Sequence, residues 1–176
     1  SGAAGTWTNI PTSGGGERDV FSAPSTTDSN DWALVPVTTT AVYAFRRNAT
    51  GTGVDAASYS ATGNSWAAMS PAPPAFGTGQ AFKSGAGLFG ATDGANSIWL
   101  FAVNTDSANS ILYTKYNGTT WSPWAAITNT TTGTQNRNFL SGYPRVSSGR
   151  VGLIWTEGTT SFDVLTTSLA TTTLQA

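Results

Sequence analysis

The sequence predicts an all-β protein, folded as a partial or oligomer-completed β-propeller of about three four-stranded blades. Three observations lead to this fold class. Helix-forming segments are nearly absent, short strand-like runs alternate with turns, and the same landmarks recur about every 55 residues. A repeat of that length holds four strands and their loops, which is the content of one propeller blade. A β-sandwich of duplicated hairpins is the alternative fold.

The strand-like runs are rich in β-branched and aromatic residues and are bounded by turn-forming residues. The clearest runs cover residues 41–45, 97–103, 111–116 and 151–155. Gly, Pro, Ser or Thr interrupts nearly every ten residues, so helices of ordinary length are not expected. Asn117-Gly118 follows the third run directly and predicts a tight hairpin turn.

The repeats are defined by the spacing between two recurring features, an apolar strand-like run and a turn that is followed by Trp. The run that starts at Ala41 recurs from Ser97, 56 residues later, and the turn before Trp66 recurs before Trp121, 55 residues later. We therefore predict a single all-β repeat domain over residues 1–176. Its approximate repeats are 7–66, 67–121 and 122–176.

About three repeats are too few for a closed ring, because propellers usually have four to eight blades. An open arc exposes sheet edges and blade faces at both ends. We expect the chain to be a fragment of a longer polypeptide, to bind a companion chain, or to complete its ring by self-association. Residues 159–174 favour pairing beyond their own sheet, because Asp163 is their only charge and they contain no Pro.

Composition excludes several classes of function. Charged residues make up 10% of the chain, with eight basic and nine acidic groups and no run of one sign, so binding to nucleic acid is not expected. The absence of Cys and His excludes thiolate catalysis, a His-based triad and an ordinary zinc site. No apolar stretch approaches the roughly 18 residues of a membrane span, so membrane insertion is not expected. We predict no cofactor and no metal.

The acidic residues do not indicate catalysis. A glycosidase needs two facing carboxylates about 5–10 Å apart, and the sequence singles out no such pair among its nine. The densest charged cluster, residues 17–19 after three glycines, is more typical of a solvated loop with local ion pairing. We therefore predict that the protein is not an enzyme.

A surface rich in Ser, Thr and Asn is common in secreted proteins, so we expect an extracellular or cell-surface location. Three N-x-[ST] triplets begin at Asn48, Asn117 and Asn129. They are glycosylation acceptors only in a host that glycosylates, and triplets of this kind arise by chance in so polar a chain.

Three segments resemble propeller families. Residues 59–66 (YSATGNSW) with the following MSPAP resemble the outer part of a kelch-type blade. Residues 114–121 (TKYNGTTW) resemble the Asp-box turn of sialidase-type propellers, with Tyr116 where the defining Asp stands. Residues 113–124, ending in WSPW, resemble the W-S-x-W blades of bacterial propeller lectins, with residues 100–103 as the upstream apolar strand. The lectin resemblance implies shallow sugar pockets between adjacent blades.

Aromatic rings are the clearest resource for binding, because sugars present apolar C–H faces together with hydroxyls. Trp7, Trp66 and Trp121 recur with the repeat, and we expect them to pack between blades. The candidate ligand-binding residues are aromatic residues that do not recur cleanly and arginines that could hold a polar ligand. They are Trp124, Tyr116, Trp32, Arg137 and Arg145.

The leading hypothesis is a non-catalytic extracellular recognition module that binds carbohydrate in pockets between blades. Its partners would be a glycan or cell-surface polymer, together with a second copy or a companion chain. The first alternative is a structural subunit of a surface fibre, sheath or adhesin, which the low charge and Thr-rich strands suit. The second alternative is a degenerate sialidase-like hydrolase domain.

Overall fold

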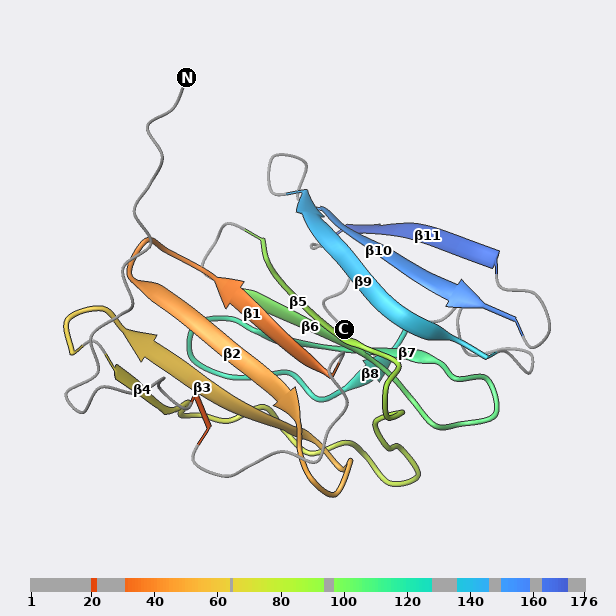
Figure 1. Cartoon of the computed structure of the whole chain (residues 1–176), viewed down its shortest axis with the longest axis horizontal. Helices are drawn as coiled ribbons and strands as arrows, with labels where there is room; N and C mark the ends of the chain where they lie inside the picture. The colour runs from red at the N-terminus through yellow and green to blue at the C-terminus, as the bar shows by residue number, and fades with distance from the viewer. Residues whose placement is uncertain are drawn as a thin grey trace.

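The computed structural model describes residues 20–21, 31–63, 65–93, 97–127, 136–145, 150–158 and 163–170, to which every structural statement below refers. These residues form eleven β-strands, drawn in Figure 1. The strands are β1 (Trp32–Pro36), β2 (Ala41–Arg47), β3 (Val54–Ser60), β4 (Ser65–Ala68), β5 (Leu88–Thr92), β6 (Ile98–Val103), β7 (Ile111–Tyr116), β8 (Ala125–Ala126), β9 (Asn138–Arg145), β10 (Arg150–Glu157) and β11 (Asp163–Ala170). No helix in the described residues could cross a membrane.

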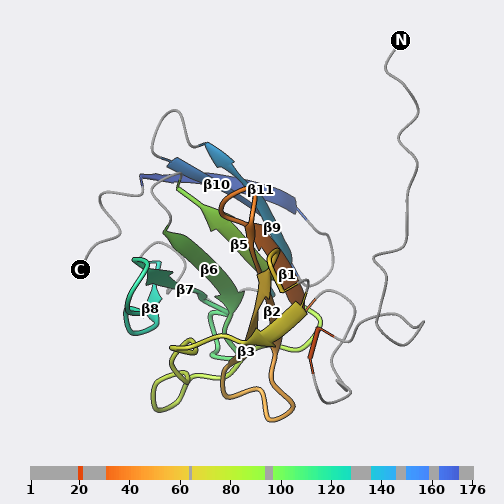
Figure 2. The same cartoon turned by 90° about the vertical axis from the view of Figure 1, so that its left-hand side faces the viewer.

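The strands form three antiparallel meanders, in which each strand pairs with the next one in the chain. Blade 1 is β1–β4, blade 2 is β5–β8, and blade 3 is β9–β11 within the described residues. The first strand of blade 2, β5, lies between β1 and β9, so the blades follow one another around an axis (Figures 1 and 2). This arrangement confirms the predicted partial propeller and not the sandwich.

The strand starts show how the blades relate to the predicted repeats. Second strands begin at Ala41, Ile98 and Arg150, which gives intervals of 57 and 52 residues. Trp66 lies inside β4, and Trp121 lies four residues before β8. In the predicted 159–174 tail, β11 pairs with β10.

Blade 2 is packed on both faces, and its strand β6 shows this most clearly. All six side chains of β6 are buried, whereas a strand with one solvated face would alternate. The even-numbered residues of β6 belong to a core shared with blade 1, and the odd-numbered residues belong to a core shared with blade 3. Blade 2 is therefore the centre of both hydrophobic cores.

The core between blades 1 and 2 also includes the segment that connects them. Phe45 from β2, Leu112 from β7, and Phe76 and Phe82 from the connection at 69–87 meet in this cluster. Asp31, fully buried before β1, accepts hydrogen bonds from the amides of Gly85 (3.0 Å) and Gly87 (3.3 Å). This carboxylate fixes the end of the connection against the start of blade 1.

Glycine allows the inner strands to approach closely. A Cβ atom at Gly90 of β5 would lie 2.4 Å from Cγ2 of Val35 in β1, and one at Gly142 of β9 would lie 2.7 Å from the ring of Phe89 in β5. Both distances are shorter than a van der Waals contact. At both junctions between blades, a glycine on the inner strand therefore lets the side chain of the neighbouring strand approach closely.

Replacing Gly90 with Ala tests this inner junction. We expect Gly90→Ala to lower the free energy of unfolding by about 1–3 kcal/mol, because the added methyl overpacks a closed core. Gly53→Ala is the matched control, since a Cβ there would make ordinary contacts of 3.4 Å or more. Chemical denaturation of both variants measures the difference. An equal loss in the two would contradict close packing at β1 and β5.

Candidate functional site

A pocket of about 490 Å³ lies on blade 1. Strands β2, β3 and β4 supply most of its lining, and Val20, Phe21, Met69 and Ala72 supply the rest. Arg46 and Asp55 face each other across β2 and β3, and Asp55 and Trp66 both line the cavity. Strand alternation puts Arg46 on the opposite face from its neighbour Phe45, which belongs to the core with blade 2. The part of the pocket lined by Arg46, Asp55 and Trp66 therefore lies on the face of blade 1 that is turned away from blade 2. Val54, Ala56 and Met69, which also line the pocket, belong to the core shared with blade 2 or pack against it.

An ion pair forms the polar side of this pocket. Nε of Arg46 lies 3.1 Å from Oδ2 of Asp55, and the guanidinium carbon of Arg46 lies 4.4 Å from the centre of the Phe21 ring. The Arg46 side chain is 13% exposed, whereas that of Asp55 is 42% exposed. The pair and the ring hold the guanidinium in place, and the carboxylate remains accessible from the pocket.

Trp66 and several alanines form the apolar side. The Trp66 ring, half-buried, is tilted against Tyr59 with 5.3 Å between ring centres. Ala57 and Ala68, on adjacent strands, line the pocket with methyl groups only. An aromatic ring, an accessible carboxylate, a guanidinium and a small apolar surface together suit a compact ligand with both apolar and hydroxyl groups.

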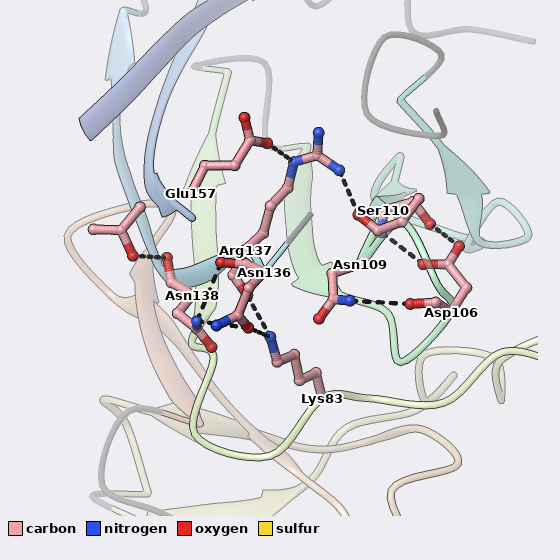
Figure 3. Close-up of polar contacts among 10 residues, drawn as sticks. Lys83, Asp106, Asn109, Ser110, Asn136, Arg137, Asn138 and Glu157 are labelled. Carbon is pink, nitrogen blue, oxygen red and sulfur yellow. Dashed lines mark hydrogen bonds and ion pairs between the residues drawn. The ribbon is translucent and has the colours of Figure 1, made fainter. Parts of the chain in front are cut away.

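A second polar cluster lies where blade 3 meets blade 2, and Figure 3 shows its contacts. Arg137 is 5% exposed, forms an ion pair with Glu157 of β10, and donates to the carbonyl of Ala108 (2.6 Å). Nζ of Lys83 donates to Oδ1 of Asn136 (2.7 Å) and to the carbonyl of Arg137 (2.8 Å). These contacts join the two blades, so the cluster has a structural role.

Two titrating groups in this cluster have shifted pKa values. Burial lowers the pKa of Lys83. For Asp106, burial acts to raise the pKa, but hydrogen bonds from Ser110 and Asn104 and the charge of Arg137 outweigh it and lower the pKa below the ordinary value. The ionised form of Asp106 is therefore part of the folded structure at neutral pH.

The sequence-predicted aromatic residues Trp124 and Tyr116 lie in the core between blades 1 and 2, where they are 7% and 8% exposed. The indole of Trp124 donates to the carbonyl of Pro74 (2.9 Å) and packs edge-on against Phe76. The Tyr116 hydroxyl donates to the carbonyl of Gly118 (2.9 Å), and burial together with Tyr43 raises the pKa of Tyr116. Packing accounts for both rings, and we do not place them in the pocket.

The other three predicted residues are dispersed. Trp32 is 57% exposed on β1, opposite Arg46 in the strand register but outside the pocket lining. Arg137 is held by the cluster described above, between blades 2 and 3. The backbone of Arg145 pairs with Arg150 at the end of β9, and its side chain lies outside the described part of the chain. The five residues do not gather into one site.

Sequence reasoning did not select the pocket residues Arg46, Asp55 and Phe21. A usable signal was the hairpin between β2 and β3, because pairing across its turn places Arg46 opposite Asp55. Trp66, expected between blades, is half-buried on the outward face of blade 1. Trp121, also half-buried, does contact Phe45 of blade 1 as expected, with 5.9 Å between ring centres, and Trp7 lies outside the described residues.

Comparison with known proteins supports the fold. No family model and no curated protein sequence matches the chain. An Aleuria aurantia lectin variant in complex with Fucα1-6GlcNAc is similar with a TM-score of 0.51 and 8% identity, over 80% of this chain and 45% of that one. Another structure of this lectin, described as a six-bladed β-propeller with a novel fucose recognition mode, gives 0.47, 8% identity and the same coverage.

A fucose lectin from Kordia zhangzhouensis in complex with methyl-fucoside gives a TM-score of 0.44 at 11% identity, over 79% of this chain and 92% of that chain. The present chain thus spans about half the length of the Aleuria aurantia lectin. The Aleuria aurantia lectin structure with a TM-score of 0.51 supports the β-propeller fold of the sequence resemblance. The structures named here do not identify the W-S-x-W family itself.

Asp106 gives a pH-dependent prediction. Because its pKa is lowered on folding, its stabilising effect is fully present above the unfolded-state pKa of about 4 and disappears as pH falls through the folded-state value. We expect unfolding free energy, measured by urea titration from pH 7 to pH 2, to fall less steeply below pH 4 in Asp106→Asn. Ser110→Ala, which removes one donor, should give an intermediate slope. Parallel curves for all three proteins would contradict this assignment.

Proposed function

We propose that the chain is a non-catalytic recognition module that binds carbohydrate in the pocket of Arg46, Asp55 and Trp66. The observation that supports this most directly is the pairing of an accessible carboxylate and a guanidinium with an aromatic ring around about 490 Å³. That volume lies in the range of roughly 300–1,000 Å³ typical of small-ligand sites. It is large enough for a monosaccharide and part of a second sugar.

The pocket residues have complementary roles in this proposal. The Asp55 carboxylate accepts hydrogen bonds from sugar hydroxyls, and the Arg46 guanidinium donates to ring or hydroxyl oxygens. The Trp66 ring packs against the C–H face of the sugar. Hydrogen bonds to charged groups are worth about 1.5–3 kcal/mol each, so these two side chains would provide much of the affinity of a small sugar.

Fucose is the first sugar to test. The alanine side chains of β3 and β4 offer a methyl-sized apolar surface, which suits the C6 methyl group of a 6-deoxyhexose. The names of the structural neighbours describe fucose complexes, which supports the same choice. Asp55 is the only carboxylate among the described lining residues, whereas a glycosidase uses two facing carboxylates.

We also propose that the module acts outside the cell or at its surface. Its low charge and its Ser- and Thr-rich composition support this location. Glycans displayed on cells or on secreted polymers would then be its partners.

Removing a pocket side chain should weaken sugar binding. We expect Arg46→Met and Asp55→Asn each to raise the Kd for methyl-fucoside about 10- to 100-fold, because each loses a charge-assisted hydrogen bond. Isothermal titration calorimetry measures this change. Arg47→Met is the matched control, since the neighbouring arginine does not line the pocket.

A glycan array with the wild-type chain tests the broader proposal. If the wild-type chain binds a glycan and both pocket variants fail to bind it, the result supports the site, and the bound glycan identifies the sugar. Binding that the pocket variants retain would exclude this site. The absence of binding to every glycan would exclude the proposed function.

A further inference from the structure

The exposed large hydrophobic side chains lie on the inner strands of the two end blades. Trp32 and Leu34 of β1 are 57% and 52% exposed, and Phe139 and Tyr143 of β9 are 59% and 48% exposed. These four are the exposed large hydrophobics of the described chain. On β1, the buried residues Ala33 and Val35 alternate with them and face blade 2.

Strand β9 also has one face against blade 2 and one exposed face, but here the even-numbered residues are the ones that face blade 2. Leu140 is buried in the core shared with blade 2, and Gly142 lies against Phe89 of β5. Ser141 and Tyr143 therefore point away from blade 2, and both are exposed. The protein thus has two apolar end faces, one on β1 and one on β9, with no described blade packed on either.

The internal junctions show how such faces fit together. The β1 residues Ala33 and Val35 pack against position 90 of β5, and the β5 residue Phe89 packs against position 142 of β9. The odd-numbered face of one inner strand therefore meets the even-numbered face of the next. One further step of this pattern brings Ser141 and Tyr143 of β9 onto Trp32 and Leu34 of another β1.

We propose that two copies of this chain close a six-bladed ring, with β9 of each copy packed on β1 of the other. Each copy supplies three blades and carries both complementary faces. The two copies are then related by a two-fold axis that coincides with the central axis of the ring. Both end faces of each copy are buried, so the closed assembly leaves no unpaired face.

Solution mass tests the assembly directly. The 18.1 kDa chain should sediment as a dimer of about 36 kDa, which is twice the chain mass. Trp32→Arg and Tyr143→Arg should each give monomers, because each buries a charge at the new junction. Thr119→Arg, at an exposed turn of blade 2, is the control and should remain dimeric. A wild-type monomer at 100 μM, or polymers that lengthen with concentration, would overturn the proposal.

Engineered cysteines test the pairing of the strands. The Cβ of Ala33 lies 3.4 Å from a Cβ built at Gly90, close to the roughly 3.5–4.5 Å of disulfides. The equivalent pair at the new junction is Ser141 with Leu34 of the second copy. We expect the double variant Leu34→Cys/Ser141→Cys to form a covalent dimer on mild oxidation, since the chain has no other cysteine.

The single variants make this test specific. Leu34→Cys alone and Ser141→Cys alone should stay uncrosslinked, because in the proposed ring each position meets the other one. Crosslinking of Leu34→Cys alone, or none in a folded double variant, would overturn the arrangement. Asp55→Asn, one strand further from β1, should still dimerise, so a failure of sugar binding and a failure of assembly can be told apart.

Discussion

The two-sided burial of β6 is the constraint on which the rest of the structure depends. A strand with no solvated face must be apolar throughout, and Ile98–Val103 satisfies this over its whole length. Both neighbouring blades must then present apolar faces to blade 2, which explains why the two cores meet there. The face of each end blade that is turned away from blade 2 is consequently the one that no described blade covers, and Arg46, Asp55 and Trp66 lie on that face of blade 1.

Much of the fold could be predicted because its signals are local. Short apolar runs, a hairpin turn at Asn117-Gly118 and a regular interval are visible within a few residues of each strand. The position of the blade boundaries could not be read in this way. The outermost strands β4 and β8 have only four and two residues, so their pattern is too short to mark where a blade ends.

The site was less predictable because it depends on contacts between distant residues. Phe21 reaches Arg46 from a separate segment, and no sequence interval signals that contact. The aromatic candidates illustrate the opposite difficulty. Trp124 does not recur with the repeat, yet its N–H is satisfied by the carbonyl of Pro74, so a buried position suits it as well as an exposed one. Composition identifies such rings without revealing which of them solvent reaches.

The hydrogen bonds from Trp121 and Trp124 to Pro71 and Pro74 also affect how the chain folds as it is synthesised. Each bond joins residues 50 positions apart, so the connection after blade 1 docks only when the end of blade 2 has emerged from the ribosome. At about 5–20 residues per second, that delay is roughly 3–10 s. During this time the side chains of blade 1 that will face blade 2 are accessible to chaperones. We therefore expect the core shared by the first two blades to close only after blade 2 has been synthesised.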